Sequence, residues 1–260
     1  MMTPFRNPEF ARAYHRKGEA CRDIGNNELA LKNYIRATEL DCEFLDAFLD
    51  LGDLLRDLGE FQRAAENYTK AIDLDTTRTE SYISRAHVYG AMGEHELEVA
   101  DYDSAIVLMP HNPILHGRRG AALILLGKYD EAIDDYSILL ALKPTFLWVR
   151  VIRGDAYAAL GRNEEAIEDY TSFINLHPEY AETYVSRGTA WHNLGEYQKA
   201  IEDHNRAIEL SPDLGEAYYH RGLSREELGM TMPAVADYRM AAQLGDENAQ
   251  KLLKDRNIFQ

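Results

Sequence analysis

Arginine and aspartate recur in step along this chain, and together they could form ion pairs or bind an acidic ligand. Each arginine precedes its aspartate by 16 residues, in the pairs Arg85–Asp101, Arg119–Asp135, Arg153–Asp169, Arg187–Asp203 and Arg221–Asp237. Upstream, both residue types are missing together, and Lys17 with Asn33 and Leu51 with Asn67 take their places. A guanidinium can form two parallel hydrogen bonds to one carboxylate, which favours arginine over lysine. We therefore predict a structural ladder of ion pairs, with a row of arginines that binds an acidic ligand as the alternative.

Other residues with reactive side chains give little reason to expect catalysis. Cys21 and Cys42 lack the spacing of a zinc site, and the glycines are not arranged as a phosphate-binding loop. His192 and His220 could approach each other, but two histidines do not make a convincing metal site. Carboxylates are numerous, so a glycosidase-like pair stays open, although no position singles one out. We expect no enzyme activity, no cofactor and no metal.

The elements that position these residues repeat every 34 residues. Glycine occupies one column at Gly18, Gly52, Gly120, Gly154, Gly188 and Gly222, with Ala86 as the exception. It occupies a second at Gly25, Gly59, Gly93, Gly127, Gly161, Gly195 and Gly229. Alanine follows at Ala30, Ala64, Ala132, Ala166, Ala200 and Ala234, with Glu98 as the exception. An aromatic column holds Tyr34, Tyr68, Tyr102, Tyr136, Tyr170 and Tyr238, with His204 as the exception.

Each column has a physical reason. The second glycine suits the left-handed turn that ends a helix, and the small residues allow two helices to approach closely. Proline at Pro110, Pro144, Pro178 and Pro212 stops one helix and allows the next to begin. Two antiparallel helices in each of seven copies make a helical solenoid. Ala86 and Glu98 are larger than their counterparts, so we predict a wider helix pair in the third copy, with a hinge or specialised site as the alternative.

The period and these columns resemble the tetratricopeptide repeat family over about residues 11–248. The resemblance implies an all-α, right-handed superhelical solenoid of seven helix-turn-helix units with a C-terminal capping helix. We expect an N-terminal segment 1–10, repeats 11–44, 45–78, 79–112, 113–146, 147–180, 181–214 and 215–248, and a capping helix 249–260.

In this family the first helices of the repeats line a concave groove that binds peptides or extended protein segments. The resemblance places in this groove Ile83, His87, Ile114, Arg118, Ala121, Ile124, Trp148, Val151, Ile152, Asp155, His192 and Tyr219. The middle of the row is apolar, which is typical of an interface, and the ends are charged. Packing of Trp148 and Ile152 between neighbouring helices, away from any ligand, is the alternative.

One specialised ligand is disfavoured. Some members of the family hold the C-terminal carboxylate of heat-shock chaperones with lysine, asparagine and arginine from three consecutive repeats. The corresponding positions here carry His15, Glu19, Asp50, Glu80 and Ser84. The acidic residues would repel a carboxylate.

The composition limits the partners. The net charge of −16 opposes binding to a nucleic acid backbone and permits basic or apolar protein partners. No apolar run is long enough for membrane insertion, and Met1–Phe10 lacks the apolar core of a signal peptide. Two cysteines that are most simply reduced fit a cytoplasmic location.

We therefore expect a non-enzymatic protein–protein interaction scaffold that binds a protein or peptide partner in its groove. The alternative is a self-assembling structural scaffold, a homo-oligomer joined through its ends or its convex surface. Ile258 and Phe259, near the end of the chain, would either complete the cap or contribute to such a contact.

Overall fold

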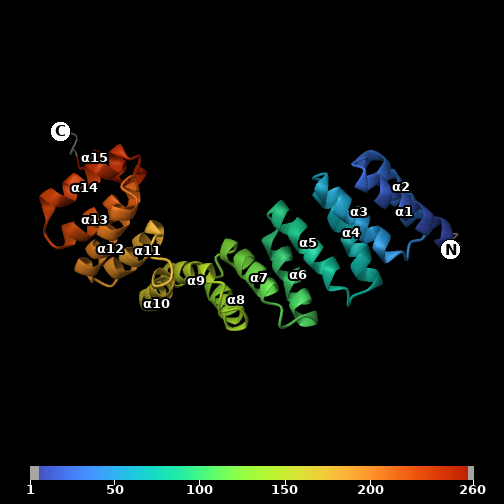
Figure 1. Ribbon diagram of the computed structural model, residues 1–260, viewed down its shortest axis with the longest axis horizontal. Coiled ribbons are helices and arrows are strands. Elements are labelled where there is room, and N and C mark those ends of the chain that lie inside the picture. Colours follow the sequence, from blue (N-terminus) through green and yellow to red (C-terminus); the bar gives the residue numbers. More distant parts are fainter. Residues whose placement is uncertain (1–5, 257–260) are drawn as a thin grey trace. The chain divides into compact units, whose positions relative to one another are not determined.

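The computed structural model describes residues 6–256, and these residues form fifteen α-helices and no strand (Figure 1). The helices are α1 (Pro8–Asp23), α2 (Asn27–Leu40), α3 (Leu45–Asp57), α4 (Phe61–Leu74), α5 (Thr79–Met92), α6 (His95–Leu108), α7 (Pro113–Leu125), α8 (Tyr129–Leu142), α9 (Trp148–Ala159), α10 (Asn163–Ile174), α11 (Ala181–Asn193), α12 (Tyr197–Leu210), α13 (Gly215–Glu227), α14 (Thr231–Gln243) and α15 (Glu247–Asp255). The all-α prediction is confirmed.

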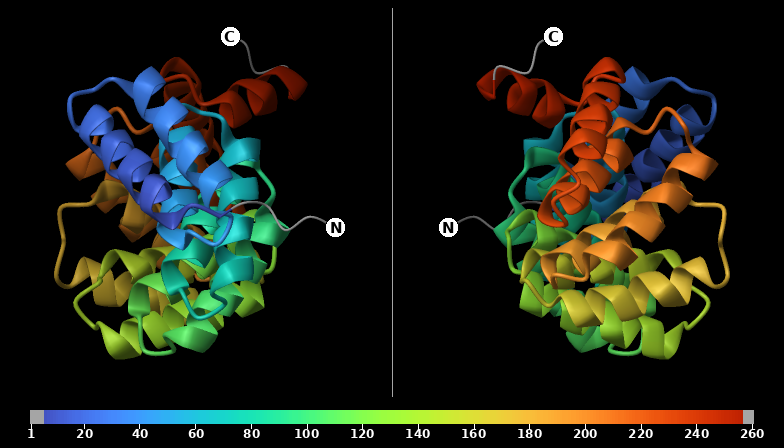
Figure 2. Two further views of the ribbon diagram at one scale, coloured as in Figure 1. Left: turned by 90° about the vertical axis from the view of Figure 1, so that its right-hand side faces the viewer. Right: turned by 90° about the vertical axis from the view of Figure 1, so that its left-hand side faces the viewer.

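The chain divides into two compact units, with unit 1 ending at Lys128 and unit 2 beginning at Tyr129. Unit 1 holds α1–α7 and unit 2 holds α8–α15. Within each unit every helix packs on the next one along the chain, which confirms a solenoid of helix pairs (Figures 1 and 2). The right-handed course of the whole chain extends over both units and stays a prediction.

The turn between the two helices of each pair is set by glycine. All seven glycines of the second column have φ between 71° and 79°, in the left-handed region. A residue with a Cβ atom is strained in this region, so the predicted role of these glycines is confirmed.

The first glycine column makes room for the aromatic column. A Cβ atom at Gly154 would lie 2.7 Å from the ring of Tyr170, and one at Gly188 would lie 2.6 Å from the ring of His204. In the third repeat a different glycine makes room for Glu98, the residue that breaks the alanine column. A Cβ atom at Gly90 would lie 2.9 Å from the carboxylate of Glu98, so this extra glycine accommodates the larger side chain. The wider helix pair expected in that repeat stays a prediction.

The last helix covers the end of unit 2. Asp246 caps α15 by accepting a hydrogen bond of 2.7 Å from the backbone nitrogen of Ala249. Leu253 is buried beside Tyr238 of α14, and Figure 2 shows α15 next to the last helix pair. α15 begins at Glu247, slightly earlier than predicted. Ile258 and Phe259 lie outside the described residues.

Candidate functional site

The arginines of the ladder are engaged by carboxylates. In unit 2, Arg153 donates from Nε (2.7 Å) and Nη2 (2.8 Å) to the two oxygens of Asp169, whose side chain is 4% exposed. The same two-bond geometry joins Arg85–Asp101, Arg187–Asp203 and Arg221–Asp237. Arg119 and Asp135 belong to different units, so their pairing stays a prediction. Because these four guanidinium groups are occupied, an acidic ligand has little to gain from them.

Each of these arginines also reaches back to the preceding repeat, a contact that the pairing pattern did not predict. Arg153 Nη1 donates to the hydroxyl of Ser137 (2.8 Å), and Arg187 donates to Thr171 (3.1 Å). Arg85 and Arg221 make the equivalent bonds to Thr69 and Asn205. One side chain therefore links three helices. The signal was in the sequence, as a polar residue 16 positions before each arginine.

The aromatic column extends toward acidic residues on the first helices. The hydroxyl of Tyr170 donates to Oδ1 of Asp155 (2.7 Å), and Tyr68 donates in the same way to Asp53 (2.7 Å). Burial raises the pKa of Asp155, and the hydrogen bond from Tyr170 opposes this shift. The tips of the core tyrosines thus help to position carboxylates of the predicted groove row.

His204 breaks this pattern. Its side chain is fully buried, and neither ring nitrogen has a hydrogen-bond partner among the described residues. Burial, together with the positive charges of His220, His192 and Arg221, lowers the pKa of His204 to about 3. The imidazole is therefore neutral at physiological pH.

A cavity of about 220 Å³ opens on the first helices of unit 2. We call it the unit-2 cavity, and it is lined by Asp155, Ala158, Tyr170, Val185, Ser186, Thr189, Ala190, Asn193, Glu216 and His220. Asp155 lines it from the set of groove residues named above. Other groove-facing positions that the resemblance predicts on the first helices of repeats five to seven also contribute, namely Ala158, Val185, Ser186, Thr189, Glu216 and His220.

Unit 1 has a cavity of similar size, about 210 Å³, on its own first helices. This unit-1 cavity is lined by His15, Glu19, Asp46, Leu49, Asp50, Asp53, Arg78 and Glu80. Its lining is predominantly acidic, with Arg78 the sole permanent cation among the lining residues.

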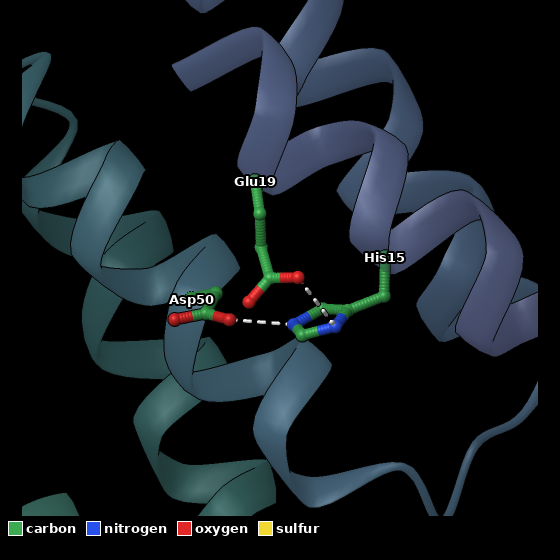
Figure 3. A group of neighbouring side chains, drawn as sticks. All are labelled: His15, Glu19 and Asp50. Carbon is green, nitrogen blue, oxygen red and sulfur yellow. Dashed lines mark hydrogen bonds and ion pairs between the residues drawn. The ribbon is translucent and has the colours of Figure 1, made fainter. Parts of the chain in front are cut away.

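Three of these residues form the cluster in Figure 3, whose ligand atoms lie close enough together to suggest a metal. His15 Nε2 lies 2.5 Å from Asp50, and Nδ1 lies 3.8 Å from Glu19. Burial lowers the pKa of His15, but the hydrogen bond to Asp50 and the charges of Asp50, Glu19 and Asp46 outweigh it and raise the pKa. A protonated imidazole donates from both nitrogens and has no lone pair for a metal. The geometry therefore favours an internal ion pair.

Trp148 has features of both positions considered from the sequence, a groove position exposed to a ligand and a packed position between helices. Its ring centroid lies 4.5 Å from that of Phe173 and 4.6 Å from that of Tyr180, yet the residue is 51% exposed. It lines a separate apolar cavity of about 340 Å³ with Thr145, Phe146, Leu147, Val149 and His177. Ile152 is 42% exposed and lines neither the unit-2 cavity nor the apolar cavity beside Trp148.

The predicted apolar patch is divided between the two units, so its continuity stays a prediction. In unit 1, Ile114, Arg118 and Ala121 are exposed and Ile124 is half-buried. Ile83 packs against the buried cluster around Tyr102, and in unit 2 Val151 packs against the cluster around Tyr170. These two residues contribute mainly to the core.

The remaining predicted residues are partly buried. Burial, with the charges of Arg118 and Arg56, lowers the pKa of His87. Nδ1 of His192 lies 3.0 Å from the hydroxyl of Ser224. Tyr219 packs against Tyr238, with ring centroids 6.1 Å apart.

Family models match three parts of the chain. Models described as tetratricopeptide repeats match residues 15–79 and 181–214, and one described as TPR repeat matches residues 154–195. A comparison with curated proteins finds no match. Among the described residues, no helix is both long and apolar enough to span a membrane.

Solved structures share the fold at low sequence identity. A tetratricopeptide repeat protein from Parabacteroides merdae has a TM-score of 0.60 and 22% identity, with 95% of this chain and 98% of that chain covered. The protein YrrB has a TM-score of 0.63 and 22% identity, with coverages of 71% and 95%. The MamA protein has a TM-score of 0.61 and 23% identity, with coverages of 65% and 92%.

Proposed function

Because the chain belongs to the tetratricopeptide repeat family, we propose that it is a non-enzymatic scaffold whose first helices bind an extended segment of a protein partner. The observation that carries the proposal is the position of the two cavities, which open on the first helices of their units. YrrB, which has a similar fold, is described as a TPR protein with an unusual peptide-binding site. That description supports the same use of the fold here.

The charge of these surfaces favours basic or apolar segments. Asp46, Asp50, Asp53 and Glu80 line the unit-1 cavity, and the whole chain carries a net charge of −16. A partner with positive charges would be attracted over a distance and oriented by the acidic residues. A groove held by helix packing needs little ordering on binding, which preserves affinity.

The test is a selection of random peptides on the purified full chain. We expect the selected peptides to lose binding when a cavity is blocked or its charge reversed, through Thr189→Arg in unit 2 and Asp46→Lys in unit 1. Glu202→Lys, an exposed acidic position on α12 outside both cavities, is the matched control and should bind normally. Helicity of all variants is compared by circular dichroism.

Two outcomes would overturn the proposal. The first is a set of peptides that bind every variant equally well. The second is a failure to select any peptide together with a concentration-dependent mass that disappears when Ile258–Gln260 is deleted. That result would favour the self-assembling scaffold instead.

A further inference from the structure

Building on the proposed function, we propose that His192, His204 and His220 form an acid-sensitive latch between repeats six and seven. These repeats consist of α11 with α12 and of α13 with α14. Acidification opens the packing of α12 against α11 and α13, and a segment bound in the unit-2 cavity holds this packing closed. The surrounding pH thereby regulates the cavity that the proposed function assigns to the partner.

Each histidine of the latch lies on a different helix. His204 projects from α12, and a Cβ atom at Gly188 of α11 would lie 2.6 Å from its ring. The same ring stacks on that of His220 on α13, with centroids 5.9 Å apart and planes at 24°. His192 of α11 also reaches α13, because its Nδ1 lies 3.0 Å from the hydroxyl of Ser224. The three side chains therefore lie where α11, α12 and α13 meet.

The closed latch has no place for a proton on His204. The side chain is fully buried, and neither ring nitrogen has a hydrogen-bond partner within residues 6–256. The ionisable groups that act on it are His220, His192 and Arg221, which are all cationic when charged. Burial and these charges lower the pKa of His204 to about 3. A charge on this ring would be neither hydrated nor paired, so protonation requires His204 to leave its position.

The carboxylates of this region are engaged with other groups. They are Asp203, Glu216, Glu227 and Asp237. Asp203 is bound by Arg187, at 2.8 Å and 2.7 Å. Asp237 is bound in the same way by Arg221, and Glu216 lies 3.7 Å from His220. Glu227 acts on His192, where it opposes the lowering of the pKa by burial. In the part of the chain that the structure describes, no carboxylate is among the groups that shift the pKa of His204.

The latch is connected to the unit-2 cavity through α13. His220 stacks on His204 and also lines the cavity, as does Glu216 one turn earlier on the same helix. The rest of the lining comes from α9, α10 and α11. The cavity wall is therefore complete only while α13 stays packed in place. A segment that binds this wall stabilises the closed latch, because it binds the closed form and not the open one.

Repeat six is the one repeat whose buried ring changes charge in acid. The other six repeats have tyrosine in the column where repeat six has His204. Burial raises the pKa of Tyr170 in repeat five and of Tyr238 in repeat seven, so both rings stay neutral in acid. Because a solenoid repeat packs only on its neighbours, α12 and α13 can open while α9 and α10 stay folded.

The size of the effect follows from the two pKa values of His204. The pKa is about 3 in the closed form and returns to its ordinary value of about 6.5 in the open form. Between these values the open form binds a proton that the closed form does not, so opening becomes more favourable as the pH falls below about 6.5. The equilibrium constant for opening should be about thirtyfold larger at pH 5.0 than at pH 7.5.

The test is hydrogen–deuterium exchange of the purified full chain at pH 7.5 and pH 5.0, corrected for the pH dependence of the intrinsic exchange rate. We expect the protection of α12 and α13 to fall about thirtyfold in acid, with a much smaller change in α9 and α10. His204→Tyr restores the residue of the other repeats, and His204→Phe supplies a second ring that does not titrate. Both should lose most of the acid effect. His111→Tyr changes an exposed histidine of unit 1 and should keep it in full.

A selected peptide tests the connection to the cavity. The peptide is one that binds the wild type at pH 7.5 and loses binding to Thr189→Arg. Present at about thirty times its dissociation constant at pH 5.0, it should restore the protection of α12 and α13 that acid removes. A peptide that loses binding to Asp46→Lys in unit 1 is the control and should restore nothing.

Three results would overturn the latch. An equal loss of protection in α9, α10, α12 and α13 would mean that unit 2 opens as a whole. An undiminished acid effect in both His204 variants would mean that another group is responsible. A unit-2 peptide that fails to restore protection would separate the opening from the cavity. The exchange experiment on the free chain needs no peptide, so a failure to select any peptide would overturn the proposed function without deciding whether acid opens α12 and α13.

Discussion

Repeats five (α9 and α10) and six (α11 and α12) of unit 2 share the same set of packing contacts, which we call the frame, and differ at the end of the buried ring in the aromatic column. Both have a first-helix glycine against an aromatic ring, a glycine turn with positive φ, and an arginine that grips a buried aspartate. Repeat five then ends its buried ring in a hydroxyl bonded to Asp155, whereas His204 in repeat six ends in a nitrogen without a partner. The comparison teaches that the glycine contact, the glycine turn and the arginine–aspartate pair do not depend on which ring fills this position, because all three are the same in both repeats.

The largest effect should come from breaking the shared frame. Asp169→Ala and Asp203→Ala each leave a mostly buried arginine without its carboxylate, which costs about 3–5 kcal/mol. We expect similar losses in the two repeats, with Asp169 slightly the greater because Arg150 also donates to it (3.4 Å). Both tryptophans, Trp148 and Trp191, lie in unit 2, so urea unfolding followed by tryptophan fluorescence reports on this unit.

The control for this prediction replaces both partners. Arg153→Met combined with Asp169→Leu removes the two charges together and should recover most of the lost free energy. If Asp203→Ala proved nearly neutral while Asp169→Ala was costly, the two repeats would not share a frame.

The next prediction distinguishes the histidine ring of repeat six from the tyrosine ring of repeat five by the pH dependence of the free energy of unfolding. The pKa of His204 is about 3 in the folded protein, below its value of about 6.5 in an unfolded chain. Between these values the unfolded chain binds a proton that the folded protein does not, so stability falls as the pH drops below about 6.5. The loss from His204 alone amounts to about 2 kcal/mol at pH 5.

His204→Phe should remove this loss, so the variant should lose less stability than the wild type between pH 7 and pH 5. The measurement is the urea midpoint at each pH, read by tryptophan fluorescence. The difference between the two proteins isolates the contribution of His204, because every other titratable group is the same in both. Parallel pH profiles would mean that His204 is protonated in the folded protein.

These columns also show how far the sequence could predict the structure. A strict 34-residue period made the helices, the glycine turns and the Arg153–Asp169 type of pair predictable, because each rests on local geometry or fixed spacing. The cavities were harder to predict, because they depend on which side chains meet across neighbouring repeats. His204 was visible only as an exception to a column. Its lack of a partner is a three-dimensional fact that no spacing reveals.

A smaller effect should have opposite signs in the two repeats. Tyr170→Phe removes the donor to Asp155 and should destabilise unit 2 by about 1 kcal/mol. His204→Tyr restores the column and allows a hydroxyl to reach Thr189, so it should stabilise unit 2 by about 1 kcal/mol. Tryptophan fluorescence during urea unfolding measures both. Destabilisation by His204→Tyr would show that repeat six no longer has room for a tyrosine.

The smallest effect tests where the restored hydroxyl goes. In the wild type His204 makes no hydrogen bond to Thr189. If the hydroxyl in His204→Tyr bonds to Thr189, then Thr189→Ala should cost about 0.5–1 kcal/mol more in the His204→Tyr background than in the wild type. Urea unfolding of the four proteins, followed by tryptophan fluorescence, gives this coupling free energy. Asn193→Ala, which changes another lining residue of the unit-2 cavity, serves as the control and should show little coupling. A coupling near zero at Thr189 with a clear one at Asn193 would place the hydroxyl beside Asn193 instead of Thr189.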